Sequence, residues 1–172
     1  VCHSDIHIWE GHYDLGAGKK ITLKDRGIDL PLTLGHEIAG EVVALGAHAA
    51  DPSVLGAQVV VFPWLGCGVC ATCKRGDENL CLKSRSLGVF QSGGYAEYVV
   101  VPSTKYCINI AGLDAAEAAP LACSGVTTFS AIKKFGTVIH DEPVVIMGDF
   151  NDTLASSTTQ IIAATQIGRA HV

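Results

Sequence analysis

The chain has 172 residues, of which 17% are charged, and a net charge of −5 with neutral histidines. This length fits one domain of ordinary size, or one domain and a piece of another. Lys and Arg are scattered rather than gathered in a stripe, which argues against nucleic acid as a partner. Every long uncharged run contains Pro, Gly, Cys, Ser or Thr, so none suits a membrane-spanning helix. We therefore expect a soluble protein whose partners are neither nucleic acid nor membrane.

The start of the chain gathers polar and titratable side chains in the segment VCHSDIHIW (residues 1–9). A thiolate at Cys2, a hydroxyl at Ser4 and an imidazole at His7 can together hold a metal and carry protons away from it. A polar surface turn is the alternative, and this segment alone does not decide between the two. Residues 10–31, rich in Gly, Lys and Asp, are predicted to form a long surface loop with one short strand.

A second candidate cluster lies in the segment LGHEIAGEVVALG (residues 34–46). The β-branched residues of this segment predict a strand that begins near Ile38. His36 and Glu37 precede that strand and are candidates for metal binding or acid–base chemistry, although a lone His–Glu pair is usually structural. Residues 59–62 predict another buried strand, which leads to Trp64.

Four cysteines crowd into the loop CGVCATCKRGDENLC (residues 67–81). Four closely spaced thiolates match the tetrahedral coordination of a structural zinc ion. Two disulfides are the alternative, but two consecutive C-x2-C spacings favour a metal. Cysteines used for metal rather than for pairing also indicate a reducing, cytoplasmic setting. The predicted ligands are Cys67, Cys70, Cys73 and Cys81.

The rest of the chain changes from strands to helices. Residues 93–102 and 106–110 are predicted as strands, and many short strands separated by Gly or Pro favour a partly open barrel. Asp114 is expected to cap an Ala-rich helix. A second helix is predicted over residues 127–135, ended by Gly136, and a buried parallel strand over residues 143–148. The predicted fold class is therefore mixed α/β.

Taken together, the motifs CHSD (residues 2–5), the 35–46 segment, the four-cysteine loop and LACSG (residues 121–125) resemble those of zinc-dependent alcohol dehydrogenases of the medium-chain superfamily, in the same order. The resemblance covers residues 1 to about 148. It implies a GroES-like, partly open β-barrel catalytic domain over residues 1–126. It also implies that residues 127–172 are the truncated start of a Rossmann nucleotide-binding domain.

The resemblance further implies the residues of a catalytic zinc site. The ligands would be Cys2, His36 and Cys123. A set of two cysteines and one histidine is the catalytic zinc site for which alcohol dehydrogenase is the standard example. Glu37 would be an acid that can approach the metal, and Asp5 a partner of the ligands.

Other matches to the family are weaker. Ser4 and His7 match a proton relay. His3, Thr127 and Gly148 match cofactor contacts, with a solvated surface residue as the less favoured alternative for His3. Trp9 and Trp64 match residues that line the substrate pocket, with ordinary core aromatics as the alternative.

By this resemblance the protein is an oxidoreductase that interconverts an alcohol and an aldehyde or ketone by hydride transfer to NAD or NADP. The metal would lower the pKa of the alcohol as a Lewis acid. The resemblance implies two zinc ions per subunit and a homodimer or homotetramer.

The loop GDFNDT (residues 148–153) departs from the glycine-rich fingerprint of the family. Phe150 and Thr153 replace glycines that allow the backbone to approach a pyrophosphate, and Asp149 and Asp152 add negative charge there. Residues 167–172 match one reading frame of a sequencing-library adaptor, so we expect them to be non-native. The sequence therefore predicts an inactive fragment of a longer dehydrogenase. The alternative is a non-catalytic, zinc-stabilised module that has lost cofactor binding.

Overall fold

The structure is a computed structural model that describes residues 1–134. Two compact units divide the chain, Val1–Thr127 and Thr128–Val172. Of the second unit, the described residues are the last turns of α4 (Ser124–Lys134). The predicted strand over residues 143–148, the loop that begins at Gly148 and the helix end at Gly136 lie outside the described residues, and so does the predicted Rossmann start.

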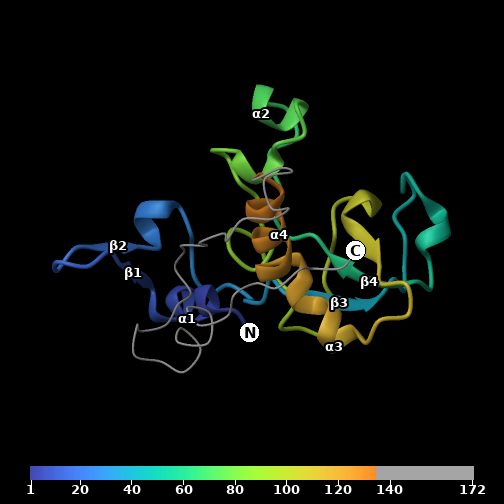
Figure 1. Cartoon of the computed structure of the whole chain (residues 1–172), viewed down its shortest axis with the longest axis horizontal. Helices are drawn as coiled ribbons and strands as arrows, with labels where there is room; N and C mark the ends of the chain where they lie inside the picture. The colour runs from blue at the N-terminus through green and yellow to red at the C-terminus, as the bar shows by residue number, and fades with distance from the viewer. Residues whose placement is uncertain (135–172) are drawn as a thin grey trace, which may run out of the picture. The chain divides into compact units, whose positions relative to one another are not determined.

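The first unit contains a three-stranded antiparallel sheet with the order β3 (Ile38–Glu41), β4 (Gln58–Val61) and β5 (Cys107–Asn109), of which β3 and β4 are labelled in Figure 1. Successive side chains of a strand point to opposite faces. Accordingly, Val59 and Val61 pack in one hydrophobic cluster and Val60 packs in another. The second cluster contains Ala122, so this face of the sheet supports the segment that leads into Cys123.

The N-terminal segment forms a helix, α1 (His3–Glu10), which the sequence did not predict. The Asp5 carboxylate accepts a hydrogen bond from the Cys2 backbone N–H at 2.9 Å, which satisfies a donor at the helix start. Gly11 ends the helix with φ of +81°, a conformation that glycine adopts without strain. Ile8 is fully buried and anchors α1 in a cluster with Leu23, Ile28 and Val89.

The prediction of one short strand in residues 10–31 was incomplete. The chain forms a two-stranded antiparallel hairpin there, β1 (His12–Asp14) and β2 (Lys20–Thr22), followed by the 3-10 turn η1 (Lys24–Arg26). Three-residue strands in a segment rich in Gly, Lys and Asp give a weak sequence signal.

The predicted strand over residues 93–102 is wrong, because the structure places no strand in this segment. Its first backbone amides donate to the turn before β3 instead: Gly93 to the Thr33 carbonyl, Gly94 to that of Gly35 and Tyr95 to that of Leu34. The segment is apolar because some of its side chains pack into the core: Val99 and Val101 contact the hydrophobic cluster that contains Val59 and Val61.

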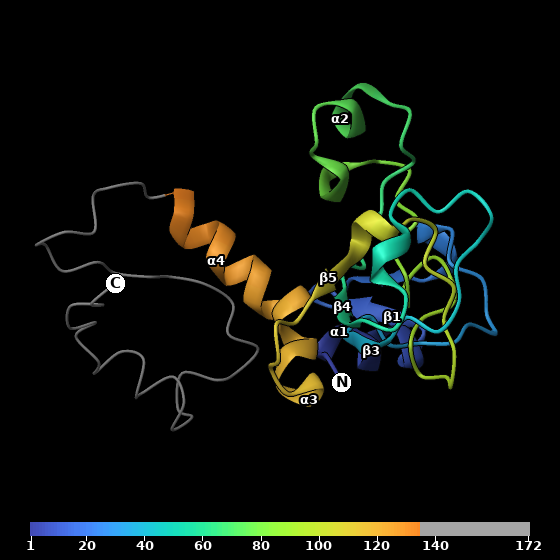
Figure 2. The same ribbon diagram turned by 90° about the vertical axis from the view of Figure 1, so that its right-hand side faces the viewer.

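A cysteine lobe, residues 66–81, stands away from the sheet in both views (Figures 1 and 2). It contains α2 (Ala71–Lys74) and the 3-10 turn η3 (Glu78–Leu80). Two further 3-10 turns, η2 (Pro52–Val54) and η4 (Thr104–Tyr106), precede β4 and β5.

The predicted cap at Asp114 is confirmed. Its Oδ1 accepts hydrogen bonds from the backbone N–H groups of Ala116 and Glu117 at 2.8 and 3.2 Å, at the start of α3 (Ala115–Ala118). The 3-10 helix η5 (Ala119–Ala122) follows, and α4 begins at Ser124, three residues before the predicted start. Among the described residues, no helix has the length and apolar character needed to cross a membrane.

Candidate metal sites

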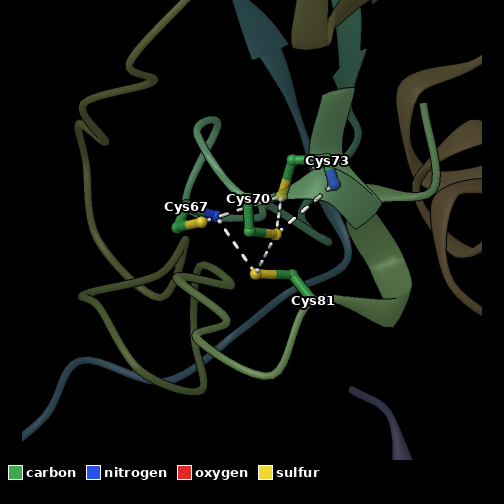
Figure 3. Close-up of side chains that lie close together, drawn as sticks. All are labelled: Cys67, Cys70, Cys73 and Cys81. Atoms are coloured by element: carbon green, nitrogen blue, oxygen red, sulfur yellow. Dashed lines mark hydrogen bonds between the residues drawn. The ribbon is translucent and has the colours of Figure 1, made fainter. Parts of the chain in front are cut away.

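The cysteine lobe brings its four sulfur atoms together (Figure 3), with every pair within 4.8 Å. The Sγ atoms of Cys70 and Cys73 are 3.4 Å apart, those of Cys70 and Cys81 are 3.8 Å apart, and those of Cys67 and Cys73 are 3.9 Å apart. Ligands of one tetrahedral zinc ion, each about 2.3 Å from the metal, are separated by about 3.8 Å. The arrangement therefore fits one four-thiolate metal site.

The backbone of the lobe also favours thiolate sulfur. Backbone N–H groups of Val69 and Cys70 lower the pKa of the Cys67 thiol to about 6. Conversely, burial raises the pKa of Cys73 to about 12. Charge repulsion disfavours four thiolates this close together unless a cation balances them, and a bound metal ion deprotonates its thiol ligands.

Gly66 is required where the lobe begins. A Cβ atom added there would lie 2.5 Å from the Cys73 sulfur and 3.1 Å from the Glu78 carbonyl oxygen. The Gly66 N–H also donates to the Glu78 carboxylate at 3.3 Å, and that carboxylate accepts hydrogen bonds from Tyr106 and Lys105. Glu78 thus ties the lobe to the turn before β5.

A second cluster of donor atoms comes from three separate segments: the start of α1, the turn before β3, and the break between η5 and α4. The ligand atoms of Cys2, His36 and Cys123 all lie within 4.8 Å of one another. The two sulfur atoms are 3.7 Å apart, although 121 residues separate them in sequence. The structure therefore brings together the three residues predicted to hold a catalytic metal.

Asp5 is buried, with 3% of its surface exposed, and it orients the residues of this cluster. Its carboxylate accepts hydrogen bonds from the backbone of Cys2 at 2.9 Å, from the backbone of Gly35 at 3.3 Å and from the Tyr95 hydroxyl at 3.0 Å. It also lies 3.2 Å from Nδ1 of His36, so Nδ1 carries the proton and Nε2 presents a lone pair. Carboxylates in this position orient the histidine ligands of metal sites.

The other ring nitrogen of His36 shows that the site fits a metal. His36 is fully buried, and its Nε2 has no hydrogen-bond partner. A buried polar atom without a partner is costly, and here it belongs to one of the three residues of the cluster. Burial raises the pKa of the neighbouring Cys123 thiol to about 12, and the nearby charges of Cys2 and Glu37 add to this effect. A zinc ion would supply the missing partner for Nε2 and favour the thiolates.

Glu37 is close to this cluster but is not part of it. Among the described residues, the group of mutually close donor atoms contains no Glu37 oxygen. Its carboxylate lies 3.1 Å from the N-terminal amine of Val1. Its predicted approach to the metal stays a prediction.

Gly148 lies outside the described residues, and the other residues predicted to relay protons or bind cofactor lie in α1 and α4. Ser4 is half-buried, whereas His3 is exposed. The His7 ring contacts the rings of His3 and Tyr13, with centroids 4.7 and 5.1 Å apart. Thr127 donates from Oγ1 to the Cys123 carbonyl at 2.8 Å. Their relay and cofactor roles stay predictions.

The two tryptophans have different environments. Trp9 is 78% exposed, which excludes the alternative that it is a core aromatic. Trp64 is half-buried, and its ring centroid lies 5.3 Å from that of His36. Its Nε1 donates to the Ala122 carbonyl at 3.0 Å, next to Cys123. Sequence reasoning missed this bond and the one from Tyr95 to Asp5, because no local pattern links residues 58 or 90 positions apart.

The fold and the two clusters are those expected of a metal-binding domain, with four cysteines in one candidate site and two cysteines and a histidine in the other. Residues 1–112 match the alcohol dehydrogenase GroES-like domain. The chain belongs to this family, within the zinc-type medium-chain dehydrogenases.

Individual relatives agree with this assignment. The chain is 47% identical over 148 residues to the NAD-dependent alcohol dehydrogenase of Sulfurisphaera tokodaii, covering 86% of this chain and 41% of the relative. It is 46% identical over 134 residues to the NAD-dependent alcohol dehydrogenase of Saccharolobus solfataricus, covering 78% and 37%. The crystal structure of the D-arabinose dehydrogenase from Sulfolobus solfataricus is similar with a TM-score of 0.65 and 34% identity, covering 78% of this chain and 38% of that one. The chain thus spans about two fifths of the length of these relatives.

Proposed function

We propose that this chain supplies the zinc-binding catalytic domain of an oxidoreductase that interconverts an alcohol and an aldehyde or ketone, with NAD or NADP as the hydride carrier. The observation that carries the proposal is the buried, unpartnered Nε2 of His36, a residue that brings a ring nitrogen within 4.8 Å of the Cys2 and Cys123 sulfur atoms. Three protein ligands with a fourth position open is the pattern of a catalytic zinc site.

In this proposal each residue has a physical role. Cys2, His36 and Cys123 would hold the zinc ion, which acts as a Lewis acid toward the substrate oxygen when bound. Asp5 keeps the proton of His36 on Nδ1, so that Nε2 remains a donor atom to the metal.

The surrounding residues would serve protons, cofactor and substrate. Ser4 and His7 are proposed to carry the alcohol proton to solvent, and Glu37 to approach the metal. His3, Thr127 and Gly148 are proposed to contact the cofactor, and Trp9 and Trp64 to face the substrate. We further propose that the four-thiolate lobe binds a second, structural zinc ion and that the enzyme is a homodimer or homotetramer.

A domain exchange tests the proposed activity. Residues 1–127 of this chain would replace the matching segment of the Sulfurisphaera tokodaii relative. The hybrid should reduce NAD in the presence of an alcohol, and the same hybrid with His36→Ala should not. A soluble, zinc-loaded hybrid without activity would contradict the proposal.

The second candidate function is a zinc-stabilised module without catalysis, which the loop GDFNDT favours. Phe150 occupies a position where a glycine allows the backbone to approach the pyrophosphate, and Asp149 and Asp152 repel phosphates. We therefore expect the 172-residue chain not to turn over.

Calorimetric titration of the 172-residue chain with NAD and NADP tests whether the altered loop has lost cofactor binding. We expect no measurable heat of binding, because Phe150 fills space that the pyrophosphate needs and the two acidic side chains of the loop repel it. Micromolar affinity for either cofactor would show that the altered loop still binds it.

A further inference from the structure

Trp64 lies where the three ligand-bearing segments of the proposed catalytic site meet. We propose that Trp64 is a positioning residue that holds the Cys123 segment against the other two ligands, through the hydrogen bond from its Nε1 to the Ala122 carbonyl. This inference rests on the proposed function of the three-ligand cluster as a metal site. This positioning role is separate from any contact of Trp64 with substrate, because the hydrogen bond holds the backbone of the protein.

The first step of the argument concerns the backbone of Cys123. This residue follows the last residue of η5 and has φ of −115° and ψ of −90°, outside the helical and extended regions. Its own carbonyl accepts hydrogen bonds from Thr127, from the backbone N–H at 3.2 Å and from Oγ1 at 2.8 Å. The preceding carbonyl, that of Ala122, accepts from Trp64 at 3.0 Å. The two peptide groups around the Cys123 Cα are therefore both held by hydrogen bonds.

The second step concerns His36. Its ring is fully buried and lies at 53° to the Trp64 ring, with the centroids 5.3 Å apart. Asp5 holds Nδ1 of the imidazole at 3.2 Å, while the indole contacts the ring itself. The same indole that bonds the Cys123 segment therefore packs against another proposed ligand.

The third step concerns α1, whose start carries Cys2. Trp64 packs against the buried cluster that contains Ile8 of α1. Trp64 itself follows β4 by three residues, next to the fully buried Pro63, so a packed part of the fold carries it. Trp64 thus bonds the segment that carries Cys123, contacts the ring of His36, and packs against the cluster that anchors α1, the helix that Cys2 precedes.

Metal binding to the full 172-residue chain tests the proposal without any need for activity. Co2+ reports on both sites at once, because a four-thiolate site and a two-thiolate, one-nitrogen site give different absorption spectra. Competition with a chelator then gives the affinity of each site. The variant Trp64→Phe keeps an aromatic ring but removes the N–H donor, and Trp9→Phe is the matched control at an exposed position.

We expect Trp64→Phe to weaken Co2+ binding at the three-ligand site by about tenfold, as for other residues that support metal ligands. Binding at the four-thiolate lobe should not change, and Trp9→Phe should leave both sites unchanged. A change of less than about twofold at the three-ligand site of Trp64→Phe would overturn the proposal.

A second variant separates the hydrogen bond from ring packing and covers the case in which Trp64→Phe does not fold. Benzothienylalanine has the shape of tryptophan with sulfur in place of the N–H group, and it can be incorporated at position 64 in the Trp9→Phe background. It should weaken the three-ligand site as much as phenylalanine does. Wild-type affinity in this variant would overturn the proposal. If the unchanged chain bound Co2+ only at the lobe, the proposed catalytic site would fail, and this inference with it.

Discussion

The two cysteine-containing candidate sites differ in how far apart their residues lie along the chain. The four proposed ligands of the lobe all come from residues 67–81, whereas those of the other site come from the N-cap of α1, the turn before β3 and the end of η5. A ligand set within one short loop can assemble around its metal without the rest of the fold. A set spread over 121 residues exists only after the sheet, α1 and η5 have packed. Metal binding should therefore order the lobe locally. Metal affinity at the three-ligand site should instead depend on the folding of the whole first unit.

The largest expected effect comes from Cys70→Ser. It should reduce zinc from two ions per chain to one and make residues 67–81 sensitive to protease, because three thiolates no longer close the tetrahedron. Metal analysis and limited proteolysis measure this. Cys107→Ser, at a half-buried cysteine outside both clusters, is the control. If zinc content and protease resistance stay unchanged, the four-thiolate site is wrong. If both metals are lost, the two sites are not independent.

Asp5→Asn should affect the three-ligand site alone. The amide keeps the shape of the carboxylate but loses its charge, so it orients His36 less well and weakens metal binding there by about 10- to 100-fold. Co2+ competition with a chelator measures the affinity, and Asp29→Asn at an exposed position is the control. An equal loss at the lobe would point to general unfolding rather than to the ligand His36.

Glu78→Gln tests how the lobe is attached to the sheet. Hydrogen bonds from Lys105 and Tyr106 lower the pKa of Glu78 below its ordinary value of 4.5. A carboxylate with a lower pKa in the folded state adds stability above its unfolded pKa, and this stability is lost as the pH falls through the folded pKa. The variant should be less stable by about 1 kcal/mol near neutral pH.

Thermal unfolding of the metal-loaded chain across acidic and neutral pH measures this difference. The gap between wild type and Glu78→Gln should be full above about pH 4.5 and should shrink as the pH is lowered further. Glu97→Gln, at an exposed position, should show no such gap. A gap that grows toward acid would have the wrong sign for a carboxylate stabilised in its charged form.

The smallest expected effect comes from Asp114→Ala, which removes the cap of α3, the helix that precedes η5 and Cys123. Loss of such a cap should cost about 1 kcal/mol of unfolding free energy. Denaturant unfolding measures it, and Asp114→Asn, which retains a capping oxygen, should remain close to wild type. Equal losses in both variants would mean that the charge of Asp114, rather than the cap, is responsible.

Local sequence patterns predicted the features whose cause is local. The C-x2-C spacings predicted a cluster whose ligands are neighbours along the chain. Asp114 ahead of an Ala-rich run predicted a cap, because the cap and the amides it binds are two and three residues apart. The β-branched run near Ile38 predicted β3. The family resemblance, rather than any spacing, selected Cys2, His36 and Cys123.

Only the tertiary structure decided how the distant segments meet. Residues 93–102 have the composition of a strand, yet their first amides bond to the turn before β3, a choice that depends on a segment about 60 residues earlier. The same holds for Tyr95 on Asp5 and for Trp64 on Ala122. Residue type sets which hydrogen bonds a side chain can make, but packing decides which partners come within reach. The sequence by itself therefore determined the four-cysteine lobe, whose residues are neighbours along the chain. The tertiary structure determined the three-residue cluster, whose members are far apart.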